Sequence, residues 1–536
     1  MHPFRAAVLA FGGRLSDAVE AGIRAAAANT LITKTNRDEI ESFLGDASNL
    51  SGGRAASLII PETEEEIAAT LAAATRERTP VTISGAGTGL VGGRVPFGGV
   101  VLATHRLNKI KEIVRDDDND DSGGRATAEA GVVLADFQRA VGAEKLFYPP
   151  DPTEWSCFLG ATVATNSSGA RTFKYGPTRR YIRRLKIALA TGDVLDLRRG
   201  ENFADARGRL RFTLGGGRAI DAQLPSYRMP ETRKHAAGYY VAPGMDAIDL
   251  FIGSEGTLGV VTELEVALLA QPEGVLSGIV FFGSEDDLLA FVGEARESSL
   301  RTRETRATGE GAPDARALEY FDAEALNFLR ERFPLVPLRA AGAIFFEQEI
   351  TSRTEERLLG AWLALLEKHG ALLNDSWFGT NEHDRAEMRE FRHQLPVMVN
   401  EWLARHGQRK VSTDISVPDA EFPRMLGFYK ERLRASRLQF VIFGHIGDNH
   451  VHVNIMPRDE VEAVAAREIY SQFIARAVEV RGTISAEHGV GKIKREYLRA
   501  LYGDEHLREM AALKRAFDPA SILGRGNIFP EELLKQ

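Results

Sequence analysis

Four histidines near the end of the chain are the residues best suited to chemistry. Three of the 12 histidines, His445, His450 and His452, lie between positions 445 and 452, and Glu487 and His488 follow. Histidine is the commonest metal ligand and a natural proton acceptor near neutral pH. Imidazoles with one carboxylate suit a divalent cation such as Zn²⁺ or Mn²⁺. The pattern therefore predicts a divalent metal site with a base beside it.

A glycine-rich loop is the second chemical feature. Residues 84–93 read SGAGTGLVGG and follow a short apolar strand, Val81–Ile83. Glycine allows a positive φ and a close approach of backbone to a ligand. Successive N–H groups in such a turn form an anion-binding nest suited to a pyrophosphate. No Lys-Ser/Thr pair follows, so the loop is not a Walker A motif, and it lacks the regular βαβ context of a Rossmann fingerprint.

Small residues recur in two later segments. Residues 157–169 read CFLGATVATNSSG, and residues 253–260 read GSEGTLGV. Together with the loop at 84–93, they predict an extended ligand that passes through channels lined by backbone.

The elements that position these residues indicate an α+β fold with short strands. After residue 269, strand–helix modules in series predict an antiparallel sheet covered by helices on one face. The expected units are a helical segment (1–50), a first domain (51–268) and a second domain (269–536). Strands are expected at 81–83, 100–103, 126–129, 185–190, 194–197, 275–282, 343–349, 440–444 and 451–456. Helices are expected at 61–78, 285–299, 354–369, 424–436 and 467–480. The charged stretch 294–316 is expected to be the end of a helix and a loop.

Composition excludes several classes of protein. The formal net charge of -8 argues against nonspecific nucleic-acid binding. A single cysteine, Cys157, rules out an intrachain disulfide and a Cys-ligated iron–sulfur cluster. No apolar run approaches the roughly 20 residues that span a bilayer. We expect a cytoplasmic protein, with docking at the inner-membrane surface left open.

These motifs in this order resemble the FAD-linked D-2-hydroxyacid dehydrogenases of the vanillyl-alcohol-oxidase superfamily. The resemblance covers roughly residues 50–530. It is carried by VTISGAGTGLVGG, PPDPT followed by GATVATNSSG, GSEGTLGV, GHIGD followed by HVN, and EHGVG. It implies a two-part FAD-binding domain of the PCMH type, followed by a substrate domain of antiparallel sheet and helices and a C-terminal helical segment.

The resemblance implies that residues of the first domain hold FAD. The loop backbone would bind the pyrophosphate, and the later segments would line the flavin and adenine ends. No histidine lies between positions 81 and 104, so we expect noncovalent FAD. The implied cofactor-binding residues are Ser84, Gly85, Ala86, Gly87, Thr88, Gly89, Gly92, Pro150, Thr153, Gly160, Thr162, Asn166, Ser167, Gly169, Glu255, Gly256, Gly259 and Val260.

The resemblance also assigns roles in the second domain. It implies His445, His452 and Glu487 as metal ligands and His488 as the catalytic base. Arg392 matches an arginine that binds the substrate carboxylate, as a guanidinium can do bidentately; a surface arginine on a helix is the alternative.

Two further positions leave alternatives open. Lys494 matches a family lysine near the substrate, with a solvated lysine at a helix end as the alternative. His450 departs from the family, in which Asn usually stands, and it is either an extra polar contact near the site or an outward strand residue.

We expect metal-assisted oxidation of a D-2-hydroxy acid, with D-lactate-like substrates favoured. D-2-hydroxyglutarate dehydrogenase activity is one alternative, and the others are an alcohol or sugar oxidase using O₂ and a flavin subunit of a larger glycolate oxidase. Electrons would pass to an external acceptor: an electron-transfer flavoprotein, a quinone, a cytochrome or an iron–sulfur subunit. A homodimer is left open.

Overall fold

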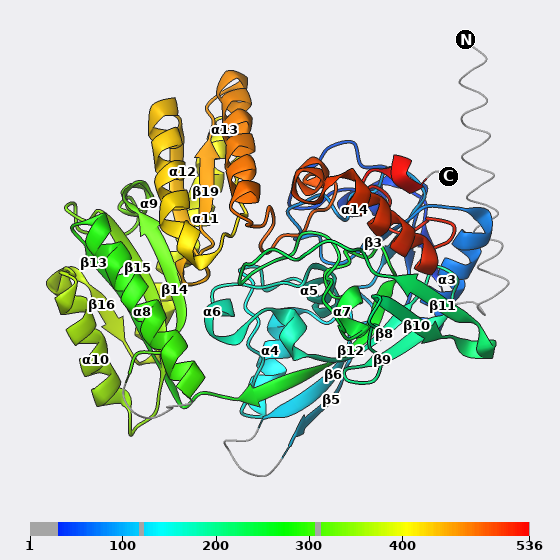
Figure 1. Ribbon diagram of the computed structural model, residues 1–536, viewed down its shortest axis with the longest axis horizontal. Coiled ribbons are helices and arrows are strands. Elements are labelled where there is room, and N and C mark those ends of the chain that lie inside the picture. Colours follow the sequence, from blue (N-terminus) through cyan, green and yellow to red (C-terminus); the bar gives the residue numbers. More distant parts are fainter. Residues whose placement is uncertain (1–30, 117–122, 306–311, 535–536) are drawn as a thin grey trace.

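The computed structural model describes residues 31–116, 123–305 and 312–534. Two main sheets, a separate two-stranded sheet and their helices occupy one side of the molecule, and a large third sheet with its own helices occupies the other (Figure 1). The end of the chain returns to the first side. No helix in the described part of the chain is long and apolar enough to cross a membrane.

The first sheet positions the glycine loop. Its strand order is β1-β2-β4-β3, with β2 and β3 both parallel to β4 and β1 antiparallel to β2. Helix α3 connects β2 to β3, so these elements form a βαβ crossover with β4 inserted, which the sequence pattern did not predict. The bounds are β1 Ile32–Lys34, β2 Ser57–Ile60, α3 Glu64–Glu77, β3 Val81–Ser84 and β4 Val100–Ala103.

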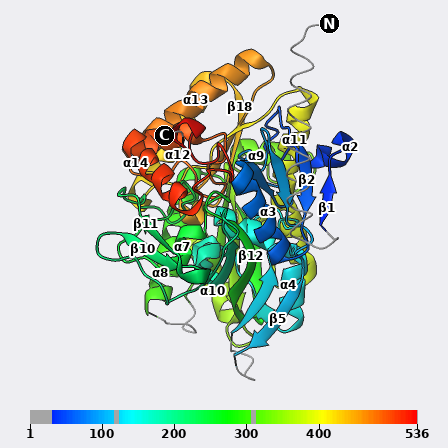
Figure 2. The same ribbon diagram turned by 90° about the vertical axis from the view of Figure 1, so that its right-hand side faces the viewer.

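The predicted helical segment at 1–50 differs from the structure where residues are described. Strand β1 pairs with β2 across the expected boundary at residue 50, and only α2 (Arg37–Ile40) and one short 3₁₀ turn are helical here. Figure 2 shows β1, β2 and α2 together at one edge. Pairing with β2 satisfies the backbone groups of β1, which outweighs local helix preference. The rest of the prediction, residues 1–30, lies outside the described residues.

The second sheet is antiparallel and follows the order β5-β6-β12-β8-β9, with β7 beside β12. Its central strand β12 was not predicted, although it pairs with β6, β7 and β8. The elements of this part are β5 Ile110–Arg115, β6 Gly124–Glu129, α4 Leu134–Ala143, β7 Leu146–Phe147, α5 Leu159–Thr165, α6 Thr172–Tyr175, β8 Ile182–Ala188, β9 Val194–Arg198, β10 Arg209–Thr213, β11 Ala219–Gln223, α7 Ile248–Phe251 and β12 Val260–Ala270.

The third sheet has seven strands in the order β16-β13-β15-β14-β18-β19-β17, and every pair is antiparallel. Its strand β14 occupies residues expected to be loop or undefined. The strands are β13 Gly274–Phe282, β14 Ala315–Asp322, β15 Gly342–Ile350, β16 Trp377–Gly379, β17 Val411–Ser412, β18 Gln439–Gly444 and β19 His452–Met456.

Helices cover both faces of this sheet, so the prediction of one covered face is wrong. On β15, Phe346 stacks on Trp362 of α10, while Phe345 belongs to the core cluster of Phe391 on α11. Successive strand residues point to opposite faces, and both faces are apolar here. The helices are α8 Glu285–Thr305, α9 Ala323–Leu329, α10 Glu355–Lys368, α11 Glu382–Arg405, α12 Phe422–Ser436 and α13 Glu460–Glu479.

The last segment packs on the first sheet rather than on the third. Leu523 forms a bridge with Val81 of β3, and α14 (Arg495–Phe517) runs beside this part of the molecule in Figure 1. A Cβ on Gly491 would lie 2.1 Å from the carbonyl oxygen of Val91, so glycine is required where the segment crosses the glycine loop. The predicted unit 269–536 therefore contributes to both halves of the molecule.

The buried carboxyl group of Asp322, at the end of β14, should make the free energy of unfolding depend on pH. It caps α9 by accepting a hydrogen bond from the Ala325 N–H at 2.8 Å, and burial raises its pKa to about 7. Because the folded pKa exceeds the unfolded one, this contribution to stability is complete below the unfolded pKa and is lost as pH rises through about 7.

Asp322→Asn keeps the cap and removes the charge. We expect the variant to exceed the wild type in unfolding free energy at pH 8 by on the order of 4 kcal/mol, with little difference at pH 4. Urea unfolding across pH 4–8 measures this. Asp459→Asn, at the exposed N-cap of α13, is the matched control. Parallel pH profiles for wild type and Asp322→Asn would contradict the prediction.

Candidate active site

A tight turn between β18 and β19 brings two of the predicted ligands together. β18 ends at Gly444, His445 follows, and a 3₁₀ turn precedes Asn449, whose φ is +54°. Asparagine tolerates this left-handed conformation better than most residues. β19 then begins at His452, and the ring centroids of His445 and His452 lie 5.4 Å apart.

Glu487 lies in a loop between α13 and α14 and completes the cluster. Its Oε2 lies 3.3 Å from Nε2 of His445 and 3.7 Å from Nε2 of His452. One ligand atom from each of these residues and from His450 lies within 4.8 Å of the others. The structure thus brings together the three residues predicted as metal ligands, and their nitrogen and oxygen donors fit a divalent cation.

Each predicted imidazole ligand is oriented by an oxygen acceptor on its other nitrogen. His445 Nδ1 lies 2.7 Å from Oε1 of Glu319, and His452 Nδ1 lies 3.0 Å from the carbonyl oxygen of Thr413. This arrangement is typical of metal-binding histidines, since the second hydrogen bond fixes the tautomer. No sequence motif marked Glu319, because it lies on β14, a strand that was not predicted.

The charge of His445 depends on its carboxylate neighbours. Burial alone would lower the pKa of His445, but Glu319 and Glu487 outweigh it and raise the pKa to about 9. Without a metal, the ring is therefore an imidazolium that neutralises the buried acids. A bound cation would take over this role and displace the proton.

Lys234 neutralises the other side of Glu487. Its fully buried Nζ lies 2.5 Å from Oε1 of Glu487 and donates to the carbonyl oxygen of Gly169 at 2.9 Å. Ser168 donates a hydrogen bond to the same Oε1 at 2.9 Å. Oε2 is left facing the histidines. No sequence motif marked Lys234, which lies in an irregular segment between β11 and α7.

Asp414 organises the predicted base. It accepts hydrogen bonds from the backbone N–H groups of Glu487 and His488 at 3.1 and 3.0 Å, and the Nδ1 atom of His488 lies 3.4 Å from its Oδ2. The His488 ring lies parallel to that of His452, with centroids 5.5 Å apart. Burial outweighs Asp414 and lowers the pKa of His488 to about 4. The imidazole is thus neutral at pH 7 and able to accept a proton.

Neither Lys494 nor Arg392 is a solvated surface residue. Lys494 is buried and donates to Oδ2 of Asp414 at 2.7 Å and to the hydroxyl of Ser485 at 3.0 Å. Arg392, on α11, forms an ion pair with Glu319 at 3.1 Å through Nε. Both therefore belong to the charge network that surrounds the histidine cluster.

The glycine loop has the donors that a pyrophosphate needs. Within the described residues, no backbone or side-chain oxygen accepts a hydrogen bond from the N–H groups of Ala86, Gly87, Thr88 or Gly89. Unpaired N–H groups in a half-buried loop are anion-binding sites. Ser84 ends β3 beneath them, and a Cβ on Gly85 would lie 3.3 Å from Ala161 of α5. The loop therefore lies against the second predicted segment, and these donors fit FAD.

Several predicted cofactor residues have a packing role. A Cβ on Gly160 would lie 2.5 Å from Ala130, and one on Gly169 would lie 1.8 Å from the carbonyl oxygen of Asp151. A Cβ on Gly256 would lie 2.8 Å from the side chain of Ile83, and one on Gly259 would lie 2.5 Å from the side chain of Ile187. These glycines allow the segments of the first domain to approach one another.

The remaining residues of the predicted set differ in exposure. Glu255 accepts hydrogen bonds from the N–H groups of Val490 and Gly491, both at 2.7 Å. The buried members are Gly92, Pro150, Thr162, Asn166 and Val260, the intermediate one is Ser167, and Thr153 is exposed.

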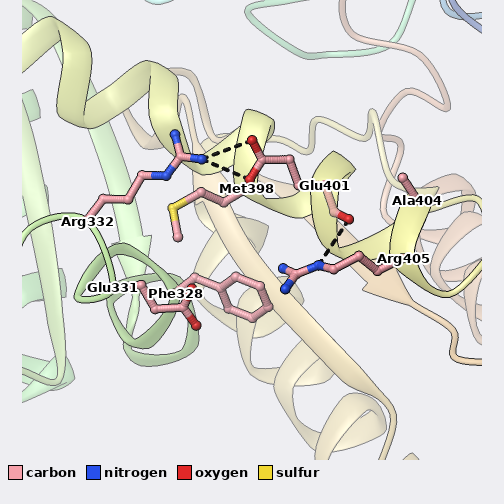
Figure 3. A pocket seen from close by; sticks show the side chains of 7 residues that line it. All are labelled: Phe328, Glu331, Arg332, Met398, Glu401, Ala404 and Arg405. Atoms are coloured by element: carbon pink, nitrogen blue, oxygen red, sulfur yellow. Dashed lines mark hydrogen bonds and ion pairs between the residues drawn. The ribbon is translucent and has the colours of Figure 1, made fainter.

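Two cavities lie outside the histidine cluster. Phe328 of α9 and Met398 of α11 line one of about 520 Å³, beside the Arg332–Glu401 ion pair (Figure 3). The other, of about 900 Å³, includes Asn166 among its lining residues. Neither contains a predicted metal ligand.

Comparison with known families identifies the chain. Residues 55–198 match the model described as FAD binding domain, and residues 301–528 match FAD linked oxidases, C-terminal domain. The glycolate oxidase subunit GlcD of Bacillus subtilis (strain 168) is 31% identical over 487 residues, which cover 90% of each chain. The chain belongs to the FAD-linked oxidoreductases of the vanillyl-alcohol-oxidase family. The predicted family, the α+β fold class and the FAD cofactor are thereby confirmed.

Other relatives of this flavoprotein carry related names. A D-lactate dehydrogenase of Anaerostipes hadrus is 28% identical over 515 residues, covering 92% of this chain and 93% of the relative. A D-2-hydroxyglutarate dehydrogenase of Xanthomonas citri pv. viticola is 27% identical over 506 residues, covering 92% and 94%. The solved structure of 4-ethylphenol oxidase from Gulosibacter chungangensis, with 17% identity and a TM-score of 0.68 over 97% and 98% of the chains, has the same fold.

Removing Lys234 should destabilise this flavoprotein strongly. Lys234→Met leaves buried Glu487 and Asp448 without their lysine partner, and breaking a buried ion pair costs about 3–5 kcal/mol. Urea unfolding measures the loss. Lys368→Met is the control, because the Lys368–Glu294 pair is exposed and is worth at most about 1 kcal/mol. Equal stability losses in the two variants would contradict the central role of Lys234.

Proposed function

We propose that this flavoprotein oxidises a D-2-hydroxy acid, with a D-lactate-like substrate favoured, to the 2-oxo acid with the help of a divalent metal. The single observation that carries the proposal is the position of the His488 imidazole, which stacks beside His452 of the histidine–carboxylate cluster. A hydroxy acid needs both a cationic group for its oxygens and a base for its hydroxyl proton. Relatives named D-lactate dehydrogenase and glycolate oxidase subunit GlcD support the substrate class.

In this proposal, different residues of the chain bind the metal and remove the proton. His445, His452 and Glu487 would hold the metal, which supplies Lewis acidity toward the hydroxyl and carboxylate oxygens. His488 removes the hydroxyl proton, while Asp414 keeps its ring in place.

Arg392 binds the substrate carboxylate in this proposal. Among the described residues, its one ion pair is made through Nε, and its Nη1 lies 3.3 Å from Nε2 of His393, which leaves Nη2 for a carboxylate oxygen. FAD, when bound by the first domain, supplies the hydride acceptor.

We further propose that FAD is held noncovalently and that an external acceptor reoxidises it. Cys157 is buried, and burial raises the pKa of its thiol to about 12, so a thiolate that could tether a cofactor is disfavoured. One cysteine also cannot build an iron–sulfur relay. The candidate acceptors are an electron-transfer flavoprotein, a quinone, a cytochrome or an iron–sulfur subunit, with the enzyme in the cytoplasm or at the inner-membrane surface.

Anaerobic flavin bleaching tests the substrate class. The purified protein is mixed with D- and L-lactate, glycolate, D-2-hydroxyglutarate and a simple alcohol, and the absorbance of oxidised FAD is followed. We expect D-lactate to bleach it fastest, with the L enantiomer inactive. Fastest bleaching by D-2-hydroxyglutarate would replace the favoured substrate, and bleaching by the alcohol alone would overturn the proposal.

The base assignment predicts a selective defect in His488→Gln. We expect the rate of flavin reduction by the best substrate to fall about 10²–10⁴-fold, the usual contribution of a general base, while the FAD content stays unchanged. Stopped-flow reduction and the flavin-to-protein absorbance ratio measure the two quantities. His506→Gln, a histidine on α14 that pairs with Glu509, is the control. An undiminished reduction rate in His488→Gln would exclude this residue as the base.

A further inference from the structure

His450 is the one member of the histidine cluster that the proposed function does not use. Its side chain is fully buried, and neither ring nitrogen has a hydrogen-bond partner among the described residues. Leaving a buried polar group unpaired costs about 1–3 kcal/mol. A buried imidazole with two unpaired nitrogens therefore indicates a ligand that binds one of them.

The carboxylate beside His450 accepts hydrogen bonds from other donors, most of them on its far oxygen, Oδ2. Nε2 of His450 lies 3.2 Å from Oδ1 of Asp414 but does not meet hydrogen-bond geometry. Asp414 instead accepts from the hydroxyl of Ser485 at 2.7 Å, from Lys494 at 2.7 Å and from two backbone N–H groups. Only the Glu487 N–H donates to Oδ1, so Asp414 can hold Nε2 of His450 in place, which leaves Nδ1 as the nitrogen available to a ligand.

The surroundings of His450 repeat those of the predicted ligands. Its ring centroid lies 4.5 Å from that of His452 and 5.3 Å from that of His445. An oxygen of Asp414 stands beside it, as Glu319 stands beside His445.

The spacing of the four ligand atoms is close to that of a coordination shell. One atom each from His445, His450, His452 and Glu487 lies within 4.8 Å of the others. Four ligands at about 2.1 Å around Zn²⁺ in a tetrahedron would be about 3.4 Å apart. The Nε2 atom of His445 already lies 3.3 Å from the Glu487 carboxylate, so a small contraction closes the set.

We propose that His450 is a third imidazole ligand of the metal, giving a His₃Glu site that selects Zn²⁺ over Mn²⁺. The inference rests on the metal site of the proposed function. A set rich in imidazole favours zinc, whereas carboxylates and waters suit manganese. The third imidazole would add one protein ligand to the three of the proposed function and would hold the metal more tightly.

Direct counting of ligands tests the proposal. The FAD-containing protein is stripped of metal, reloaded with one equivalent of Zn²⁺ and studied by zinc-edge X-ray absorption, in which imidazole scattering gives the number of bound rings. We expect three imidazoles in the wild type and two in His450→Asn. Competition titrations should show at least about a tenfold loss of Zn²⁺ affinity in His450→Asn, with a smaller change for Mn²⁺.

Matched variants separate failure of this inference from failure of the metal site itself. His445→Ala should lose zinc binding, and His383→Asn, whose side chain is exposed on α11, should change nothing. Two imidazoles in the wild type, or unchanged Zn²⁺ affinity in His450→Asn, would overturn the role of His450 while leaving the proposed function intact. Full zinc binding by His445→Ala would overturn the metal site and His450 together. If His450→Asn does not fold, the wild-type count and His450→Gln decide.

Discussion

The structure depends on neutralising several carboxylates that are buried together where the two halves of the molecule meet. Glu487 lies between Lys234 and His445, Glu319 between His445 and Arg392, and Asp414 beside Lys494. Ionised groups in such an interior are tolerated only when they are paired and hydrogen-bonded. The pairs join distant segments of the chain, so folding both halves correctly is a condition for assembling the site.

The same charges prepare the site for its chemistry. The acids around His445 raise its pKa, whereas burial keeps His450, His452 and His488 neutral. A cation therefore finds anionic oxygen and neutral nitrogen donors in one place. In many enzymes, two side chains of the same type take different catalytic roles because their surroundings give them different protonation states.

Close backbone packing brings the FAD-binding segments to this charge network. The Cβ positions of Gly160, Gly169 and Gly491 are filled by neighbouring atoms, so each marks a crossing between segments. Glu255 joins one of these segments to the backbone at 490–491, directly after the His488 loop. This contact thus joins the FAD-binding domain to the loop that carries the proposed base.

The sequence alone determined the family, the FAD cofactor and part of the strands and helices, because each rests on local motifs and periodicity. It also marked His445, His452, Glu487 and His488 as candidate site residues, because they lie in short motifs, and the structure places them together. Only the tertiary structure decided that Lys234 and Glu319 neutralise the cluster, that helices cover both faces of the third sheet, and that the chain's end packs on the first. It also decided that His450 faces inward without a partner. Burial and pairing depend on contacts between residues far apart in the chain, which no local pattern encodes.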